Sequence, residues 1–263
     1  MSKKIAQYLH TKVIGRKIIC LETIDSTNSE LRRRACAEEE GTVILSEQQT
    51  GGRGRLGREW LAPKNKGIWM SVLLKPDLSP AEIPQLTLTG AAAICLALEK
   101  ADASLCGQVT VKWPNDILLN GRKLSGILTE MQIRANTVQS IVLGIGLNLY
   151  QREEDFPPEL GKEATSLLRE TGKYYDSKML TAEILNFLES LYNNFLEQGN
   201  ISESLVICRQ RSAVIGQKVI LVDQEQKQEA EVLDLGTHGE LVVRLPNGKV
   251  TSVISGEISL RRT

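Results

Sequence analysis

The sequence of 263 residues lacks any long hydrophobic run. Its longest clean apolar stretch, residues 91–98, is far shorter than the about 20 residues that a membrane-spanning helix needs. Residues 1–10 include basic side chains but no apolar core of a secretory signal. We therefore predict neither a membrane span nor secretion, and we expect a cytoplasmic protein.

An excess of either charge is also missing. The chain has 32 Lys+Arg and 32 Asp+Glu, so its formal net charge is zero. This balance disfavours nucleic acid or an anionic membrane as the main partner. With 41% hydrophobic and 24% charged residues, the composition is that of a globular protein, not of a disordered or collagen-like one.

Cysteine and histidine are scarce. Two histidines and five cysteines, at positions 20, 36, 95, 106 and 208, show no paired spacing. The sequence therefore offers no disulfide framework, no zinc motif and no nucleophile–base pair. A core of this size needs no disulfides, and we expect buried, reduced thiols.

Hydrophobic periodicity predicts alternating strands and helices in the first 211 residues. Strands are expected at 18–24, 42–46, 68–74, 109–113, 117–119, 122–131 and 140–149. Helices are expected at 82–101, 177–198 and 201–211, and another one follows Thr27, the expected N-cap, because Thr27 and Glu30 form a capping-box pattern. Asn120-Gly121 is typical of a type I′ hairpin turn.

The pattern changes near residue 211. Beyond it, strand and turn signals alternate, at 217–223, 230–236, 240–245, 249–255 and 257–261. Five short strands in about 50 residues suggest a small barrel. We therefore predict two domains, residues 1–211 and 212–263.

The most unusual segment is Gly51–Trp60, in which glycine and arginine alternate. Gly52, Gly54 and Gly57 satisfy G-x-G-x-x-G, but no helical pattern follows, which excludes a dinucleotide-binding turn. Arginine forks on a flexible loop suit carboxylate or phosphate binding. A solvated basic loop and an RGG-like nucleic-acid patch are the alternatives.

Other polar residues are less decisive by themselves. Residues 112–116 form a compact turn, and Lys123 lies on a strand just beyond the predicted hairpin. Asp116 and Glu130 are compatible with a Mg²⁺ site or with no function at all. No P-loop motif is present, so a nucleotide would have to be held in another way.

Together these segments, in this order and spacing, resemble the biotin protein ligase family. The matching segments are Asp25–Asn28, Glu47–Thr50, GRGRLGREW from Gly52, KWPNDILL from Lys112, Gly121–Gly126, GIGLN from Gly144 and Gly256–Arg261. The resemblance covers about residues 18 to 262 and is closest to the form without an N-terminal helix-turn-helix domain. It implies an α+β fold, a mixed β-sheet flanked by helices followed by a small SH3-like β-barrel.

The resemblance implies a two-step reaction with ATP, biotin and Mg²⁺. Biotin's carboxylate attacks the α-phosphate of ATP, giving biotinyl-5′-AMP and pyrophosphate. A lysine of a biotin carboxyl carrier protein, part of a biotin-dependent carboxylase, then displaces AMP. We expect no DNA or membrane partner, and either a monomer or a homodimer. The alternatives are a lipoate or octanoate ligase, and a nucleic-acid-binding regulator.

The resemblance also assigns site residues. Biotin binding is implied for Ser26, Thr27, Asn28, Gln49, Gly52, Arg53, Gly54, Arg55, Lys123, Gly126, Gly144 and Gly146. ATP binding is implied for Arg55, Arg58, Trp60, Asn115, Lys123 and Asn148. Catalytic roles are implied for Lys123, Arg55 and Asp116, with Asp116 holding either the attacking lysine or the metal.

Overall fold

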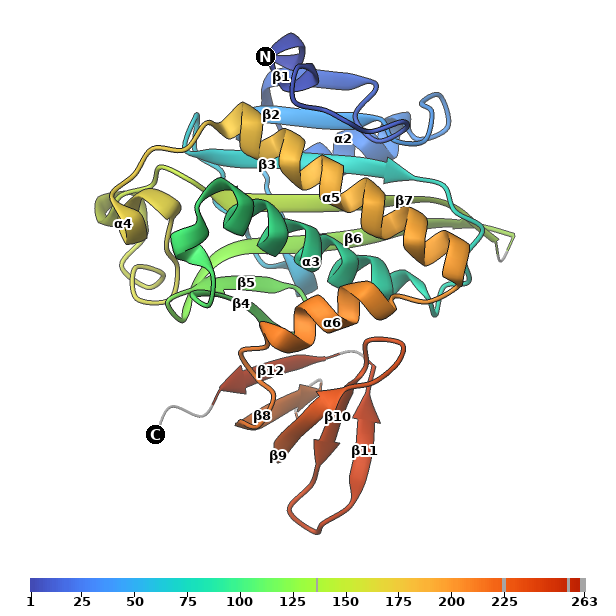
Figure 1. Cartoon of the computed structure of the whole chain (residues 1–263), viewed down its shortest axis with the longest axis vertical. Helices are drawn as coiled ribbons and strands as arrows, with labels where there is room; N and C mark the ends of the chain where they lie inside the picture. Colours follow the sequence, from blue (N-terminus) through green and yellow to red (C-terminus); the bar gives the residue numbers. More distant parts are fainter. Residues whose placement is uncertain (136, 224–225, 255, 261–263) are drawn as a thin grey trace.

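A computed structural model describes residues 1–135, 137–223, 226–254 and 256–260 (Figure 1). Its larger part is built on a seven-stranded sheet with the spatial order β1-β2-β3-β7-β6-β5-β4. The strands are β1 (Ile18–Ile24), β2 (Val43–Gln49), β3 (Gly67–Leu74), β4 (Val109–Lys112), β5 (Asp116–Leu119), β6 (Arg122–Arg134) and β7 (Thr137–Asn148). Because β1 and β2 are parallel and the other neighbours antiparallel, the sheet is mixed, which confirms the predicted fold class.

Helices cover both faces of this sheet. They are α1 (Ser2–Ala6), α2 (Thr27–Arg34), α3 (Ile83–Ala101), α4 (Leu167–Thr171), α5 (Ser177–Gln198) and α6 (Ser202–Gln210). Figure 1 shows α3 and α5 across one face and α2 behind the other. Among the described residues, no helix is both long and apolar enough to cross a bilayer.

Strand alternation divides the apolar side chains between the two faces. Met70 and Leu143 belong to the large core that includes α3 and α5. On the opposite face, Leu31 of α2 packs in a small cluster with Leu73 and Val142. Beyond Val142, the β7 residues on that second face are Gly144, Gly146 and Asn148. The sheet is therefore left open beside the start of α2.

Most of the predicted elements are confirmed, with ends shifted by a few residues. Helix α5 has the predicted bounds, and the positive φ angles of Asn120 (51°) and Gly121 (75°) confirm the type of hairpin turn. Among the described residues, five short elements were not predicted: α1, α4 and the 3₁₀ turns at Arg55–Gly57, Ala103–Leu105 and Glu153–Asp155.

The predicted start of α2 was wrong by one residue. Ser26, not Thr27, is the N-cap, since its backbone is extended and its hydroxyl accepts a hydrogen bond from Ser29 N at 3.4 Å. Glu30 does not close a capping box: its carboxylate pairs with Arg33 and Arg34 instead. Thr27 is then free to face the sheet.

The C-terminal part is a five-stranded antiparallel sheet with the order β11-β10-β9-β8-β12. Its strands are β8 (Lys218–Asp223), β9 (Gln226–Leu235), β10 (Leu241–Arg244), β11 (Val250–Val253) and β12 (Glu257–Leu260). The predicted strands are confirmed, although Ser255 and Arg261 lie outside the described residues. Within those residues β11 and β12 do not pair, because β12 pairs with β8 alone, so the sheet is open and not a closed barrel.

Several contacts join this sheet to the rest of the molecule. The indole of Trp113 donates a hydrogen bond to Gly239 O at 2.9 Å, and Arg209 pairs with Asp234 at 2.9 Å. Ala213 N donates to Val111 O at 2.9 Å, so the connecting segment lies along β4. The C-terminal sheet is thus docked against the turn that follows β4.

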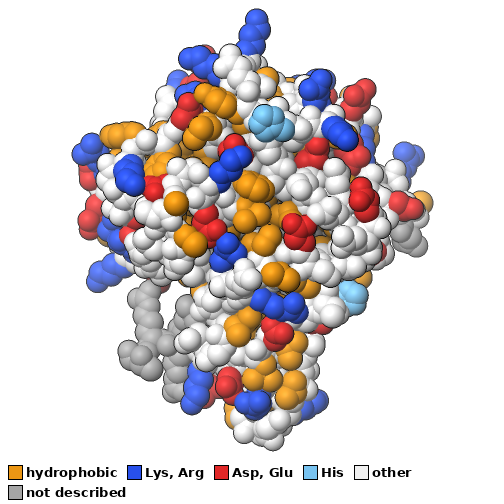
Figure 2. Space-filling model, in the orientation of Figure 1, with side chains coloured by type: hydrophobic (Ala, Val, Ile, Leu, Met, Phe, Trp, Pro, Cys, Tyr) orange, Lys and Arg blue, Asp and Glu red, His pale blue; other side chains and the backbone are white. Residues whose placement is uncertain are grey.

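On the face drawn in Figure 2, basic and acidic side chains are interspersed. No block of one sign covers that face. This distribution agrees with the zero net charge.

The five thiols are free, and the prediction that they are buried is confirmed for Cys95 and Cys208. Burial raises the pKa of Cys208 to about 12, and it also raises that of Cys95. Cys36 and Cys106 are exposed.

We expect iodoacetamide to label Cys36 and Cys106 in the folded protein, and Cys95 and Cys208 only after denaturation. Peptide mass spectrometry would detect this, and rapid labelling of Cys208 in the native protein would contradict it.

Candidate active site

A cavity of about 740 Å³ lies on the open face of the sheet, between α2, the glycine–arginine loop and the turn after β4. It brings together most of the residues that the sequence singled out. The lining includes Ser26, Thr27, Asn28, Gln49, Arg53, Gly54, Arg55, Arg58, Trp60, Asn115, Asp116, Lys123, Gly126, Gly144, Gly146 and Asn148. Gly52 is not part of it: a Cβ there would lie 2.4 Å from Trp60 O, so this glycine allows a close backbone approach inside the loop.

One end of the cavity is a hydrogen-bonded cluster at the start of α2. The Gln49 side-chain oxygen accepts hydrogen bonds from Thr27 N at 2.7 Å and from Thr27 Oγ1 at 3.1 Å. The hydroxyl of Ser71, on β3, lies 2.7 Å from Thr27 Oγ1 and 2.6 Å from Asn28 Oδ1. Sequence analysis missed Ser71, whose only signal is a polar side chain within an apolar strand.

Asn28 is held on every side. Its Nδ2 donates to Leu128 O at 3.2 Å and to Glu130 Oε2 at 2.8 Å. Its Oδ1 rests against Gly144, where a Cβ would come within 2.1 Å. Gly144 therefore makes room for the Asn28 amide.

Trp60 fills the space above the other two glycines. A Cβ on Gly146 would lie 2.5 Å from the indole, and one on Gly126 would lie 2.9 Å from it. The ring also packs edge-on against Trp69, with centroids 6.4 Å apart. Its Nε1–H is buried and has no hydrogen-bond acceptor among the described residues. A buried indole donor of this kind is complementary to an acceptor on a ligand.

Lys123 is held in place by its backbone and directed at the loop. Its N–H donates to Glu163 O at 2.7 Å, and Thr165 N donates to its carbonyl at 2.8 Å. Its Nζ lies 2.7 Å from Asp116 Oδ1 and 5.4 Å from the centre of the Trp60 ring. The prediction that this lysine lies on an ordered strand is confirmed, and it faces the glycine–arginine loop.

The loop is a short hairpin. Gly54 N donates to Arg58 O at 2.7 Å and Trp60 N donates to Gly52 O at 2.9 Å, while residues 55–57 form a 3₁₀ turn. No α-helix follows, which confirms that the loop is not a dinucleotide-binding turn. Arg55 reaches away from the hairpin, donating to Asn115 Oδ1 at 3.3 Å and to Gly256 O at 3.1 Å. This arginine connects the loop with both the turn after β4 and the C-terminal sheet.

The far wall of the cavity comes from a segment without predicted structure, residues 151–164. Asn148, at the end of β7, donates to Thr165 O at 2.9 Å and accepts from Gln151 at 2.7 Å. The other amide atom of Gln151, its oxygen, is buried without a partner among the described residues. Gln151 thus adds an unpaired acceptor beside Asn148.

Lys112 is a further cation that sequence analysis left without a role. It lines the cavity, and its side chain makes no hydrogen bond or ion pair with the described residues. The sequence feature that could have indicated a role for Lys112 is its position at the end of β4, directly before Trp113. Together with Lys123 and Arg55 it makes this side of the cavity suited to an anionic ligand.

The described residues contain no cluster of three side chains with metal-ligand chemistry. Glu130 is surrounded by Asn28, Arg32 and Arg53, so its carboxylate is already neutralised. Asp116 remains: its Oδ1 forms an ion pair with Lys123 and is buried without a hydrogen bond from the described residues. One carboxylate fits Mg²⁺ that is held mainly by phosphate oxygens.

Known families match both parts of the chain. Residues 20–148 match the Biotin/lipoate A/B protein ligase family, and residues 214–261 match the Biotin protein ligase C terminal domain. The chain is 41% identical to the bifunctional ligase/repressor BirA of Bacillus spizizenii, over 73% of this chain and 58% of that protein. The chain thus spans less than two thirds of that relative's length.

Two further relatives are covered almost entirely. The biotin–[acetyl-CoA-carboxylase] ligase of Paracoccus denitrificans is 30% identical, over 87% of this chain and 95% of its own length. The solved structure of the Aquifex aeolicus biotin protein ligase in complex with biotin and ATP is 30% identical with a TM-score of 0.79, covering 94% of this chain and 100% of that one. Because both parts of the fold and nearly the full length of these two relatives are matched, the chain belongs to the biotin protein ligase family.

Proposed function

We propose that this protein is an ATP-dependent biotin protein ligase. It activates biotin to biotinyl-5′-AMP and transfers biotin to a lysine of a biotin carboxyl carrier protein. The observation that carries this proposal is the convergence of Lys123, Arg55 and the Asn115–Asp116 turn on one cavity beside the polar cluster of α2. The similar Aquifex protein, solved with biotin and ATP, supports the choice of ligands.

The first step joins two anions. A carboxylate oxygen of biotin forms a bond to the α-phosphorus of ATP, and the bond to pyrophosphate breaks. Two unit charges about 4 Å apart repel by about 4 kcal/mol at an effective dielectric constant of 20, so a fixed cation between them lowers the barrier. Lys123 supplies that cation on a rigid strand, and Lys112 and Arg55 add positive charge along the phosphates.

The biotin end is assigned to the cluster at α2. Ser26 Oγ accepts from Ser29 N, which leaves its own O–H free to donate, and Gln49 Nε2 makes no hydrogen bond with the described residues. These two donors suit the oxygen of a ureido group. Thr27 and Asn28 are bonded to the protein, so we assign them to shaping this end of the cavity.

The nucleotide is assigned to the opposite end. Asn115 accepts a hydrogen bond from Arg55, and the Asn148 side-chain oxygen accepts one from Gln151. Trp60 lies between the two ends, where its ring can cover the reacting atoms. Arg53, Gly54 and Arg58 belong to the loop that lies over them.

Mg²⁺ supplies charge neutralisation to the phosphates when it is bound, and Asp116 is the carboxylate that would contact it. In the second step the amine of the carrier lysine forms a bond to the biotinyl carbonyl, and AMP leaves. Asp116, next to Lys123, can take up the proton that the attacking amine releases.

We also propose the division into residues 1–211 and 212–263, a cytoplasmic location, and a monomer or homodimer in solution. A lipoate or octanoate ligase is disfavoured because the C-terminal match is to biotin protein ligases. The interspersed surface charge disfavours a DNA-binding role for the face drawn in Figure 2.

The proposal is tested by mixing the protein with ATP, Mg²⁺, biotin and a biotin carboxyl carrier domain. Mass spectrometry should find one biotinyl group on one carrier lysine, and none when ATP is omitted. A carrier that stays unmodified, or that accepts lipoate instead of biotin, would refute the assignment.

A further inference from the structure

Glu130, on β6, joins three parts of the protein although it does not line the cavity. Its Oε1 lies 3.0 Å from Arg32 of α2 and 3.5 Å from Arg53 of the glycine–arginine loop. Its Oε2 accepts a hydrogen bond from Asn28 at 2.8 Å. The side chain is only 22% exposed, so these contacts are partly shielded from water.

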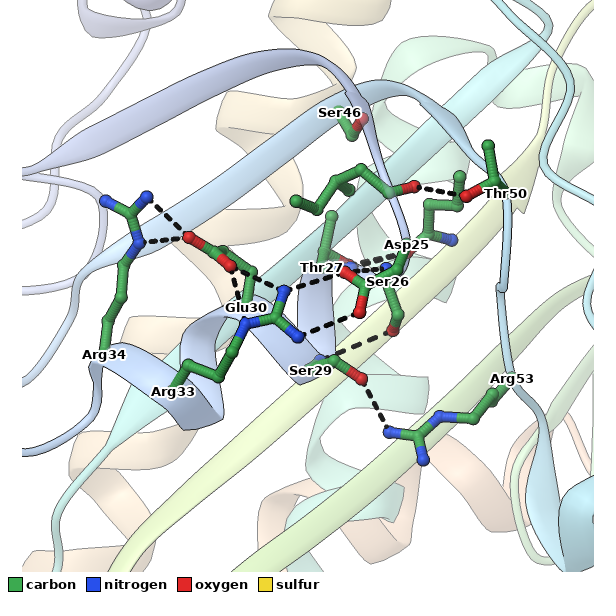
Figure 3. Close-up of polar contacts among 12 residues, drawn as sticks. Asp25, Ser26, Thr27, Ser29, Glu30, Arg33, Arg34, Ser46, Thr50 and Arg53 are labelled. Atoms are coloured by element: carbon green, nitrogen blue, oxygen red, sulfur yellow. Dashed lines mark hydrogen bonds and ion pairs between the residues drawn. The ribbon is translucent and has the colours of Figure 1, made fainter.

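The side chain of Arg53 is held by Glu130 and by α2. Its guanidinium donates to Ser29 Oγ at 2.9 Å and pairs with Glu130, so it contacts the protein on the α2 side (Figure 3). Arg53 lies at the base of the loop hairpin, where it forms an isolated bridge with Glu59. Holding this base fixes the direction in which the rest of the loop leaves the sheet.

The second oxygen of Glu130 extends the connection to the cavity. Asn28, which it holds, lies against Gly144 and within 2.6 Å of the Ser71 hydroxyl. Movement of Glu130 would therefore disturb the loop on one side and the biotin end of the cavity on the other.

We propose that Glu130 is a positioning residue that fastens the glycine–arginine loop, residues 51–60, to α2 and thereby retains the ligand beneath the loop. The inference rests on the proposed function for its ligand, but the fastening itself does not. Arg53 acts through Glu130 as the anchor of the loop, and Arg55 remains the arginine that reaches over the nucleotide end.

Hydrogen–deuterium exchange of Glu130→Gln tests the fastening without any ligand. The amide can still accept from Asn28 but no longer neutralises Arg53, so backbone exchange in residues 51–60 should become about fivefold faster, the effect of losing one partly shielded ion pair. Glu30→Gln is the matched control. This variant loses the same charge, but Glu30 pairs with Arg33 and Arg34, away from Arg53 (Figure 3). Backbone exchange in residues 51–60 should therefore change less than twofold.

Biotin release tests the consequence. Glu130→Gln should raise the dissociation rate constant of biotin about fivefold, whereas Glu30→Gln should not. Arg53→Gln should have the same effect, and Arg53→Gln with Glu130→Gln should be no worse than either alone, because the two residues act as one unit.

The outcomes separate the two proposals. Equal loop exchange in Glu130→Gln and Glu30→Gln overturns the fastening, whether or not the protein binds biotin. The fastening is also overturned if the increases in the biotin dissociation rate constant caused by Arg53→Gln and by Glu130→Gln multiply in the double variant. Faster loop exchange in a protein that fails to bind biotin supports the fastening and refutes the proposed ligase function.

Discussion

Lys123→Ala is expected to slow biotinyl-5′-AMP formation by about 10²- to 10³-fold, the range for losing one fixed electrostatic group in an active site. The reason is local: Lys123 is held by backbone hydrogen bonds to residues 163 and 165, and its Nζ is directed into the cavity beside Trp60. No mobile side chain can replace a cation fixed in this way. Single-turnover formation of the adenylate, at saturating biotin and ATP, measures the effect.

The variant also leaves Asp116 Oδ1 buried without its counter-ion, which destabilises the fold to some extent. Thermal unfolding by circular dichroism separates this from the loss of catalysis. Lys100→Ala is the control, since Lys100 pairs with Glu183 on the surface and should leave the rate unchanged. Adenylate formation at the normal rate by folded Lys123→Ala would show that the assigned role is wrong.

Gly144→Ala is expected to weaken biotin binding by about 10- to 100-fold. The added methyl would lie 2.1 Å from Asn28 Oδ1, and Asn28 cannot yield easily because Leu128, Glu130 and Ser71 all bond it. Overpacking a rigid site costs about 1–3 kcal/mol, which corresponds to this range when the strain falls on the bound state. Calorimetric titration with biotin gives the affinity.

Gly161→Ala is the matched control for that variant. Its added methyl would meet only carbonyl oxygens of Pro157 and Pro158 at 3.8 Å, an ordinary contact. Biotin affinity should stay within about twofold of the unmodified protein. Unchanged affinity in Gly144→Ala would mean that the Asn28 cluster does not form the biotin end of the site.

The elements that could be predicted are those with strong local signals. Helix α5 repeats its apolar residues over its whole length, and Asn120-Gly121 favours one turn whatever surrounds it. The start of α2 was missed by one residue because Ser26 and Thr27 are both good caps, and only the hydrogen bonds of Thr27 to Gln49 decide between them. Residues 151–164 have no periodic pattern, and their course depends on contacts with Lys123 and Asn148.

Some residues of the site could likewise be predicted from local signals and others could not. Arg55, Lys123 and Asn115 belong to segments that match the family motifs, and the fold brings them to one cavity. The resemblance assigned Gly126, Gly144 and Gly146 to biotin binding. The structure shows that Gly144 faces Asn28, while Gly126 and Gly146 face Trp60, an arrangement that depends on the register of β6 with β7. Ser71 and Glu130 belong to no recognised motif, so their contacts emerge only when distant strands are placed side by side. Lys112 opens the KWPNDILL segment, but only the fold shows that it lines the cavity.

ATP–pyrophosphate exchange measures most directly whether this cavity joins biotin to AMP. With labelled pyrophosphate, ATP and Mg²⁺, we expect label to enter ATP when biotin is added and not when lipoate is added. The rate should fall by about 10²-fold or more in Lys123→Ala. Exchange that lipoate supports as well as biotin, or no exchange with biotin at all, would contradict the proposed function.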